Sequence, residues 1–512
     1  MPDTPDRSAL LRGEDRSRSG PGAGSPPDQP GFVQRALAGH AALGLLIGGL
    51  LYLVCLSGAL AVFQQDLQRW EEPGAPEMTA ISPQAVQRAI ETTLARQGKP
   101  TDHAYVHMPT AGLPRVVVTT DNGANYVEAD GSYDRPEAHA WTEFVLFLHY
   151  YLNLPAFWGM VLTGTIGAML CAATLTGVLA HPRIFRDAFR MRLRARAQLS
   201  RADMHNRFGV WLLPFILALG LTGAVIGLGQ LVFQADASAR HGGDLEAAYA
   251  PIYGAHPAAD PRPAPAPRVD RALDWMGRHR PGLPISYVTI EETGTAGQQI
   301  QILAEEPQRL IYGETYLFDG AGHFRSTLGL SDGALGKQAA ASLYRVHFGS
   351  FGGRPVELAY LVFGLALCVV ISTGTTLWLM KRRARGLASP RLEALWAVTI
   401  WGSPLLLVLA FWLRMAAGPE APLARVFWSA LVAGSIAAAL APSPRLSDWL
   451  RQALAAMMAL TGLVHWLLAG PLPVPSLVID TALVLGGLVL ALPELGRLAR
   501  PRPTCERIAN PT

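Results

Sequence analysis

A series of eight apolar runs constrains the fold of this chain more than any other feature. A helix that crosses a bilayer needs about 20 mostly apolar residues, and most of the runs are close to that length. Half of the 512 residues are hydrophobic and only 16% are charged, which is the composition of a membrane protein. The runs cover 37–63, 155–180, 208–233, 356–380, 391–413, 426–441, 451–470 and 475–496. We therefore predict a mostly helical, polytopic membrane protein with about eight transmembrane helices.

Lysine and arginine collect in four of the segments that flank these runs. They are frequent before the first run, after the second, after the fourth (KRRARG) and after the last (GRLARPRP). Because such segments favour the cytoplasmic side, an even number of spans places both termini there. The formal net charge of +4 is thus explained by topology, and no nucleic-acid partner is expected.

Two polar segments, 65–140 and 234–345, fall outside the membrane in this topology. Each contains a short amphipathic helix, at 83–96 and 268–278, followed by extended runs. Asp-Gly pairs close both segments as hairpin turns would, at Asp130-Gly131 and Asp319-Gly320. We predict two small α+β modules on the exterior.

The resulting domain organisation has ten parts. A disordered cytoplasmic tail is followed by two pairs of spans, each pair with an exterior module between its members, then by a four-helix membrane region and a cytoplasmic tail. The boundaries are 1–35 (tail), 36–64 (first span), 65–140 (module 1), 141–181 (second span), 182–204 (basic loop), 205–233 (third span), 234–345 (module 2), 346–381 (fourth span), 390–497 (four-helix region) and 498–512 (tail).

Cysteine usage and nucleotide motifs narrow the possible chemistry. Three of the four cysteines lie inside apolar runs, and the sequence has no CxxC pair. A disulfide framework or a thiolate-held iron–sulfur cluster is therefore unsupported. The sequence also has no GxGxxG fingerprint at a strand-to-helix turn and no flavin domain.

Four histidines at the ends of apolar runs recur in register. His40 and His205 are each followed after four residues by a glycine and after eighteen by the glycine of a Ser-Gly or Thr-Gly pair. His149 and His347 precede the glycines of two further Thr-Gly pairs by 28 and 27 residues. This order makes two copies of one two-helix unit. The four pairs are Ser57-Gly58, Thr176-Gly177, Thr222-Gly223 and Thr373-Gly374, and we interpret them as sites of close helix packing.

The predicted topology places His40 and His205 at the inner leaflet and His149 and His347 at the outer one. Opposing pairs of neutral imidazoles in a helix bundle are what axial ligation of two b-type haems requires. Nearby glycines would let a flat macrocycle approach the backbone, and nearby arginines would pair with its propionates. These residues are Gly44, Gly209, Gly349, Gly352 and Gly353, with Arg207, Arg345 and Arg354.

Other histidines offer alternatives that the sequence leaves open. His181 is the rival ligand on the inner side, and its pairing with His205 would leave His40 idle. We interpret His465 as structural, and the exterior histidines as solvated, although His103 and His107 could meet a metal-bearing substrate. The exterior set is His103, His107, His139, His241, His256, His279 and His323.

The four histidine units together resemble the PepSY-associated transmembrane family of bacterial inner-membrane proteins. The matching stretches are GHAALGLLIGGLLYLVCLSGAL, FLHYYLNLPAFWG with ATLTGVLAHPR, ADMHNRFGVWLLPFILALGLTG, and YRVHFGSFGG with ISTGTTLWLMKRR. The resemblance covers about 35–385. Members are often linked with iron uptake, and some are ferric-siderophore reductases that carry two haems. The family pattern implies haem ligation by His40, His149, His205 and His347, PepSY-like exterior modules and a location in the inner membrane.

We therefore predict a haem-dependent oxidoreductase that moves electrons across the membrane through two b-type haems. The acceptor would be a ferric siderophore or another ferric chelate in the periplasm, and the donor a separate cytoplasmic reductase or a membrane quinol. The alternative class is a non-redox binding, transport or regulatory membrane protein that uses its exterior modules. Charged residues at mid-membrane in the first four spans would favour transport, and the sequence has none there.

Overall fold

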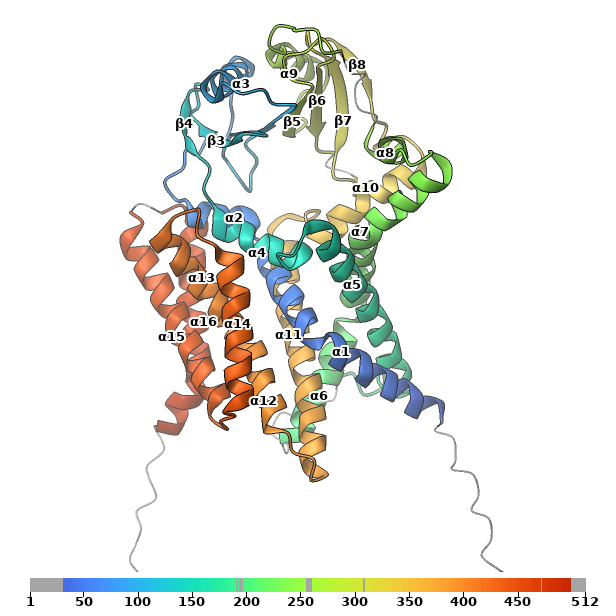
Figure 1. Cartoon of the computed structure of the whole chain (residues 1–512), viewed down its shortest axis with the longest axis vertical. Helices are drawn as coiled ribbons and strands as arrows, with labels where there is room; N and C mark the ends of the chain where they lie inside the picture. The colour runs from blue at the N-terminus through green and yellow to red at the C-terminus, as the bar shows by residue number, and fades with distance from the viewer. Residues whose placement is uncertain are drawn as a thin grey trace, which may run out of the picture.

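The chain forms a bundle of long helices with a layer of strands at one end (Figure 1). The computed structural model describes residues 31–498 except 190–191, 193–196, 255–259, 307–308 and 471. The predicted disordered tail up to residue 30, the predicted C-terminal tail from 499 on and parts of the basic loop therefore lie outside the described residues. The start of α1 and the end of α16 lie at the same end of the bundle, opposite the strands (Figure 1).

Seven described helices are long and apolar enough to cross a membrane, which confirms the predicted multi-pass helical class. They are α1 (Phe32–Ala61), α5 (Ala156–Leu179), α7 (Leu213–Arg240), α11 (Gly353–Ala384), the continuous stretch Pro390–Ala417, α14 (Leu423–Leu440) and the segment Val474–Leu492 of α16 (Val474–Leu498). The run expected at 451–470 forms α15 (Leu446–Leu468) but is absent from this set. Its first two turns carry the charged residues Asp448 and Arg451. Like the spans of the set, it packs in the bundle, where it lies beside α16 (Figure 1).

The second, third and fourth predicted spans are each divided into a short helix and a long one. The short helices are α4 (Ala140–Tyr151), α6 (Ala197–Trp211) and α10 (Leu335–Phe348), which precede α5, α7 and α11. Leu152 and Asn153 end α4 with positive φ angles of 56° and 55°, and Gly349 ends α10 with φ 69°. Pro214 at the start of α7 accounts for the break after α6, because proline cannot continue the hydrogen-bond pattern of the preceding turn. His149, His205 and His347 therefore lie on short helices, whereas His40 lies on α1.

The two exterior modules share one antiparallel sheet of eight strands in the order β4-β3-β2-β1-β5-β6-β7-β8. The strands are β1 (His103–His107), β2 (Val117–Thr120), β3 (Gly123–Val127), β4 (Tyr133–Pro136), β5 (Ile285–Glu291), β6 (Gln299–Ala304), β7 (Glu314–Asp319) and β8 (Phe324–Thr327). The modules join where β1 pairs with β5, with Val106 opposite Val288. The predicted Asp-Gly turns connect β3 to β4 and β7 to β8.

Two helices and one hydrophobic core stabilise this sheet. Helices α3 (Pro83–Gln97) and α9 (Val269–His279) contact each other, and their apolar residues pack with those of the strands. The shared core includes Ile90, Val118, Met276, Ile302 and Phe318, all less than 2% exposed. The two modules are thus one folded unit.

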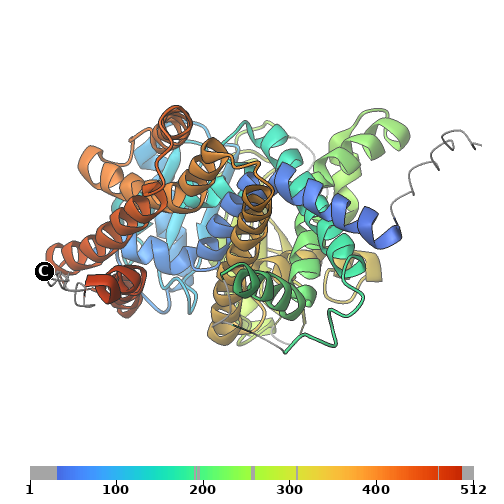
Figure 2. The same cartoon turned by 90° about the horizontal axis from the view of Figure 1, so that it is seen from below.

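The C-terminal helices, from residue 390 on, form their own group beside the first four spans. It comprises α12 (Pro390–Ala397), a π-helical turn (Val398–Gly402), α13 (Ser403–Ala417), α14, α15 and α16. Seen from below, these helices (orange to red) lie on one side of α11, with α5 and α7 on the other (Figure 2). They also contact α2 (Gln64–Glu71) and α4, which lie across the strand end of the bundle (Figure 1).

Candidate histidine-pair sites

His40 and His205 form a pair at the end of the bundle away from the strands. Their ring centroids are 5.9 Å apart, with an angle of 63° between the ring planes. His40 Nδ1 lies 2.8 Å from the Ala173 carbonyl oxygen, and His205 Nδ1 lies 2.8 Å from that of Val370. A carbonyl oxygen only accepts hydrogen bonds, so each Nδ1 carries a proton, and in the neutral ring Nε2 is then the nitrogen that keeps its lone pair. We call these two residues the inner pair.

His149 and His347 form the outer pair, at the strand end. Their centroids are 6.0 Å apart and their planes differ by 23°. His149 Nδ1 donates to the Val54 carbonyl at 2.9 Å. His347 Nδ1 lies 2.9 Å from Thr222 Oγ1, whose own hydrogen is donated to the Ala218 carbonyl. Both rings of the outer pair therefore also leave Nε2 as the free ligand atom.

The Ser-Gly and Thr-Gly pairs make room for these imidazoles. A Cβ atom added at Gly58 would lie 2.6 Å from His149 Cε1, and one at Gly223 would lie 2.9 Å from His347 Cε1. At the inner pair, Gly177 faces His40 at 3.1 Å and Gly374 faces His205 at 2.9 Å. Each histidine thus rests on a glycine of another helix, and not on the glycine that follows it in its own unit.

The separation within each pair leaves room for one metal ion between the two rings. A metal–imidazole bond is about 2 Å long, so both imidazoles of a pair could bind the same metal ion. Among the described residues, no group of three or more His, Cys, Asp or Glu side chains is arranged to hold a metal ion. Two imidazoles per site therefore fit a metal that brings its own equatorial ligands, as iron in a macrocycle does.

Two glycines near the inner pair face open space. A Cβ atom at Gly44 or Gly209, one turn after His40 and His205, would meet no atom within 4 Å. At the outer pair the glycines act differently, because Gly349 is the left-handed C-cap of α10 and faces the Tyr360 ring. Haem ligation by the four histidines itself stays a prediction.

The three arginines expected near propionates already have protein partners. Arg345 donates to the carbonyls of Ser350 and Ile311, and Arg354 pairs with the buried carboxylate of Asp66. Arg207 lies 3.8 Å from Asp203 and lines a cavity of about 280 Å³ beside the inner pair. His181, the rival ligand, lines the same cavity.

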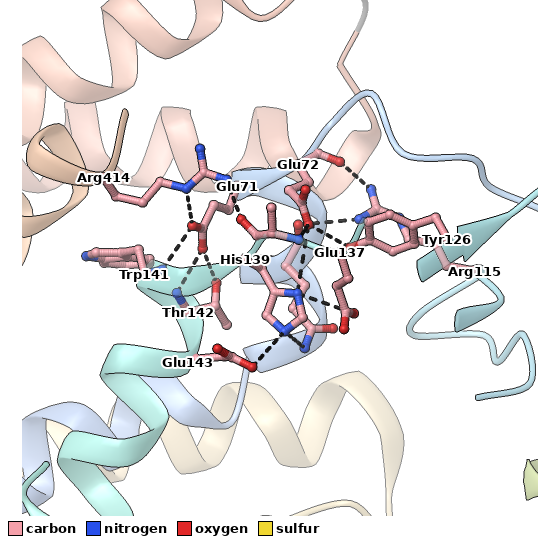
Figure 3. A network of polar contacts seen from close by, with 12 residues as sticks. Glu71, Glu72, Arg115, Tyr126, Glu137, His139, Trp141, Thr142, Glu143 and Arg414 are labelled. Carbon is pink, nitrogen blue, oxygen red and sulfur yellow. Dashed lines mark hydrogen bonds and ion pairs between the residues drawn. The ribbon is translucent and has the colours of Figure 1, made fainter. Parts of the chain in front are cut away.

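A network of acidic groups around His139 was missed by the sequence analysis. His139 was expected to be solvated, but it is only 7% exposed. Its Nδ1 lies 3.3 Å from Glu137 and 3.8 Å from Glu72, and its Nε2 lies 3.9 Å from Glu143 (Figure 3). Tyr126 donates to Glu72 at 2.7 Å. The residues come from the position directly after α2, from β3, from the loop after β4 and from α4, so no local sequence pattern marks the network.

Burial and ion pairing have opposite effects on the pKa values of His139 and Glu72. Burial alone would lower the pKa of His139, but contacts with Glu72, Glu137 and Glu143 raise it above the ordinary value of 6.5. Burial alone would raise the pKa of Glu72, but contacts with His139, Tyr126 and the Ala138 N–H lower it overall. Burial and the nearby His139 lower the pKa of His107 to about 4, so His107 is neutral at ordinary pH.

These shifts predict a pH-dependent contribution of His139 to stability. A histidine whose pKa is raised by folding stabilises the protein fully below its unfolded pKa and loses that effect as pH rises through its folded pKa. The melting temperature of His139→Gln should therefore fall further below that of the wild type at about pH 5.5 than at about pH 8.5. Thermal unfolding in detergent at both values checks this. A difference between the two proteins that does not change with pH would contradict the assigned shift.

Comparison with known proteins agrees with the helical architecture. The family model described as PepSY-associated TM region matches residues 37–381. The chain is 28% identical over 383 residues to an uncharacterized protein of Pseudomonas aeruginosa, an alignment that covers 68% of this chain and 93% of the relative. The matched residues include both histidine pairs and their four glycines, and they end before α12.

Proposed function

Because the chain belongs to the family of the PepSY-associated TM region, we propose that it transfers electrons across the bacterial inner membrane through two b-type haems. The electrons would reduce a ferric chelate, such as a ferric siderophore, on the exterior side. One observation carries the proposal: a pair of Nδ1-protonated histidines lies at each end of the helix bundle, with centroid separations of 5.9 and 6.0 Å.

The residues of the chain would bind and orient the two haems. Nε2 of His40 and His205 would hold the inner iron, and Nε2 of His149 and His347 the outer one. The carbonyls that accept from Nδ1 fix the tautomer and ring orientation, and such partners also make an imidazole a stronger ligand. When bound, a haem with two histidine ligands supplies one-electron transfer and has no open coordination position for oxygen chemistry.

Charge supports the assignment of the inner pair to the cytoplasmic side. The last turn of α11 carries Lys381, Arg382 and Arg383, and this end lies near α6, opposite the strands (Figure 1). By the same rule that orients other inner-membrane proteins, it faces the cytoplasm. The electron donor would be a separate cytoplasmic reductase or a membrane quinol.

The acceptor follows from the chemistry of the metal. One electron converts Fe(III) in the chelate to Fe(II), and the hard oxygen ligands of a siderophore hold the softer Fe(II) ion less well. Iron would therefore leave the chelate on the side of the exterior sheet. Only the coordination bonds between iron and the chelator break, and no covalent bond of the chelator does, so the protein needs no general acid, base or nucleophile for this step.

Vesicles that contain the haem-loaded protein and an impermeant reductant test this function. A ferric chelate and a ferrous-specific dye are added outside, and the rate of Fe(II) formation is compared with that in protein-free vesicles. We expect reduction outside wild-type vesicles, and a background rate in vesicles with His205→Ala. A haem-loaded wild-type protein that reduces no faster than empty vesicles would overturn the electron-transfer function and favour a binding or transport role.

A further inference from the structure

Helix α4 positions the outer histidine, yet it is too short to hold itself in place. It has twelve residues, Ala140–Tyr151, and His149 lies in its last turn. His139 at its N-cap makes no side-chain capping bond. The rotation of α4 about its axis and its position along that axis determine whether the His149 ring reaches Val54 and Gly58 on α1. The contacts that hold α4 in place therefore also hold the His149 ring in place.

The N-terminal end of α4 is capped by a carboxylate of another helix. Glu71 of α2 accepts from the backbone N–H groups of Trp141 and Thr142 at 2.9 and 2.8 Å, which supplies the acceptors that a helix N-terminus needs. Arg414 of α13 lies 2.7 Å from Glu71 and balances its buried charge (Figure 3). The Trp141 indole donates to the Leu407 carbonyl of α13 at 2.9 Å.

The C-terminal end of α4 is held by α14. Leu152 and Asn153, directly after α4, have positive φ angles, which non-glycine residues keep only when the surroundings determine them. The Trp428 indole of α14 donates to the Leu152 carbonyl at 3.0 Å. The Leu152 side chain is 1% exposed and packs in a cluster with Phe411 and Phe427. The strained turn three residues after His149 is thus fixed by the C-terminal helices.

The same apolar cluster covers one face of α4. Phe144, Val145 and Leu148 pack with Leu407, Phe411 and Leu423 of the C-terminal helices, and each is at most 4% exposed. His149, the next residue, points to α1 instead. In contrast, the carbonyls that bind the rings of the inner pair, those of Ala173 and Val370, lie on α5 and α11.

Helix α2, which carries Glu71, is itself tied to α15 and α16. The Trp70 indole donates to Asp480 at 2.8 Å, and His465 Nδ1 lies 2.9 Å from the same carboxylate. His465 Nε2 lies 3.0 Å from the Trp70 carbonyl oxygen. This buried group, with Trp70 2% and Asp480 4% exposed, gives His465 the structural role that was expected from the sequence.

From these contacts we propose that the C-terminal helices position the outer haem ligand. Arg414 and Trp428 hold the two ends of α4, Trp141 joins it to α13, and together they fix the His149 ring between α1 and His347. The residues act on the haem only through His149, so they are positioning residues. The inference rests on the proposed function because its effect is observed at the outer haem.

Tryptophan-to-phenylalanine substitutions test the proposal with little loss of packing. Arg414 is a poor choice, because its loss would leave Glu71 buried without a counter-charge. Trp428→Phe removes the indole that donates to the Leu152 carbonyl at the end of α4. Trp141→Phe removes the α4 indole that donates to the Leu407 carbonyl of α13. Trp412→Phe is the matched control, since this indole donates to Thr461 at 2.8 Å between α13 and α15. The reduction potential and the low-spin electron paramagnetic resonance signal are measured for each haem in the full-length protein.

We expect Trp428→Phe and Trp141→Phe to keep two haems while shifting the potential and the signal of the outer haem only. The inner haem serves as an internal control, and Trp412→Phe should leave both haems unchanged. Unchanged outer-haem signals in both test variants, or equal shifts in Trp412→Phe, would overturn the positioning role. If the wild type binds no haem, the proposed function fails. The same variants are then compared by the ¹⁵N resonances of the His149 ring, which are assigned with His149→Gln.

A shift of these resonances in Trp428→Phe but not in Trp412→Phe would support the positioning role without haem. Unshifted resonances in Trp428→Phe would overturn the positioning role.

Discussion

Replacing His149 with alanine is expected to lower the haem content from about two per chain to about one. His149 Nε2 is the only free ring nitrogen that α4 brings to the outer pair, because Nδ1 donates to Val54. The remaining ligand, His347, would hold the outer iron from one side only. Electron transfer across the vesicle membrane should fall by more than the roughly 10–100-fold that loss of an outer-shell partner costs.

A matched control for this variant is His323→Ala. The His323 side chain is 69% exposed and lies 3.3 Å from Asp319 in the β7–β8 turn, whereas the outer pair lies on helices α4 and α10. Its removal should leave both haems and the transfer rate unchanged. If His149→Ala retained two low-spin haems per chain by pyridine haemochrome and visible spectra, the outer site would have a different ligand from the one proposed.

Adding a single methyl group at Gly58 is expected to disrupt the outer site nearly as strongly as His149→Ala does. The Cβ atom of Gly58→Ala would lie 2.6 Å from Cε1 and 2.8 Å from Nδ1 of His149, well inside van der Waals contact. The ring would have to move away from α1, which breaks its bond to Val54 and misaligns Nε2. Haem analysis should show loss of the outer haem, or a high-spin outer haem, with the inner haem intact.

Gly49→Ala is the control within the same helix. A Cβ atom at Gly49 would meet nothing within 4 Å, and alanine is favoured over glycine inside a helix by about 1 kcal/mol. This variant should keep both haems and be at least as stable as the wild type in thermal unfolding. Equal haem loss in both variants, or none in either, would show that Gly58 does not make room for His149.

The sequence predicted the membrane class because the length and composition of apolar runs carry that information locally. Four histidines were singled out by their register, and the structure brings His40 close to His205 and His149 close to His347. The helix breaks were harder to predict. Leu152 and Asn153 have positive φ angles that these residue types do not signal, so α4 and α5 read as one span.

Long-range contacts explain what the sequence analysis missed. The glycine that faces each histidine lies on another helix, as Gly58 does for His149. The regular spacing of histidines and glycines along the sequence does not reveal such a partner. The acidic partners of His139 also come from separate segments, since Glu72 follows α2 directly and Glu143 lies on α4. The single sheet also depends on a long-range contact, since strand β1 of module 1 pairs with β5 of module 2.

The most direct test of the central claim is a visible spectrum of the detergent-purified protein, oxidised and dithionite-reduced, with a pyridine haemochrome to count haem. Two pairs of Nδ1-protonated histidines predict about two b-type haems per chain, with the sharp bands of low-spin iron bound by two imidazoles. A colourless protein from cells with an ample haem supply would contradict the account, because the two histidine pairs would then have no iron to hold.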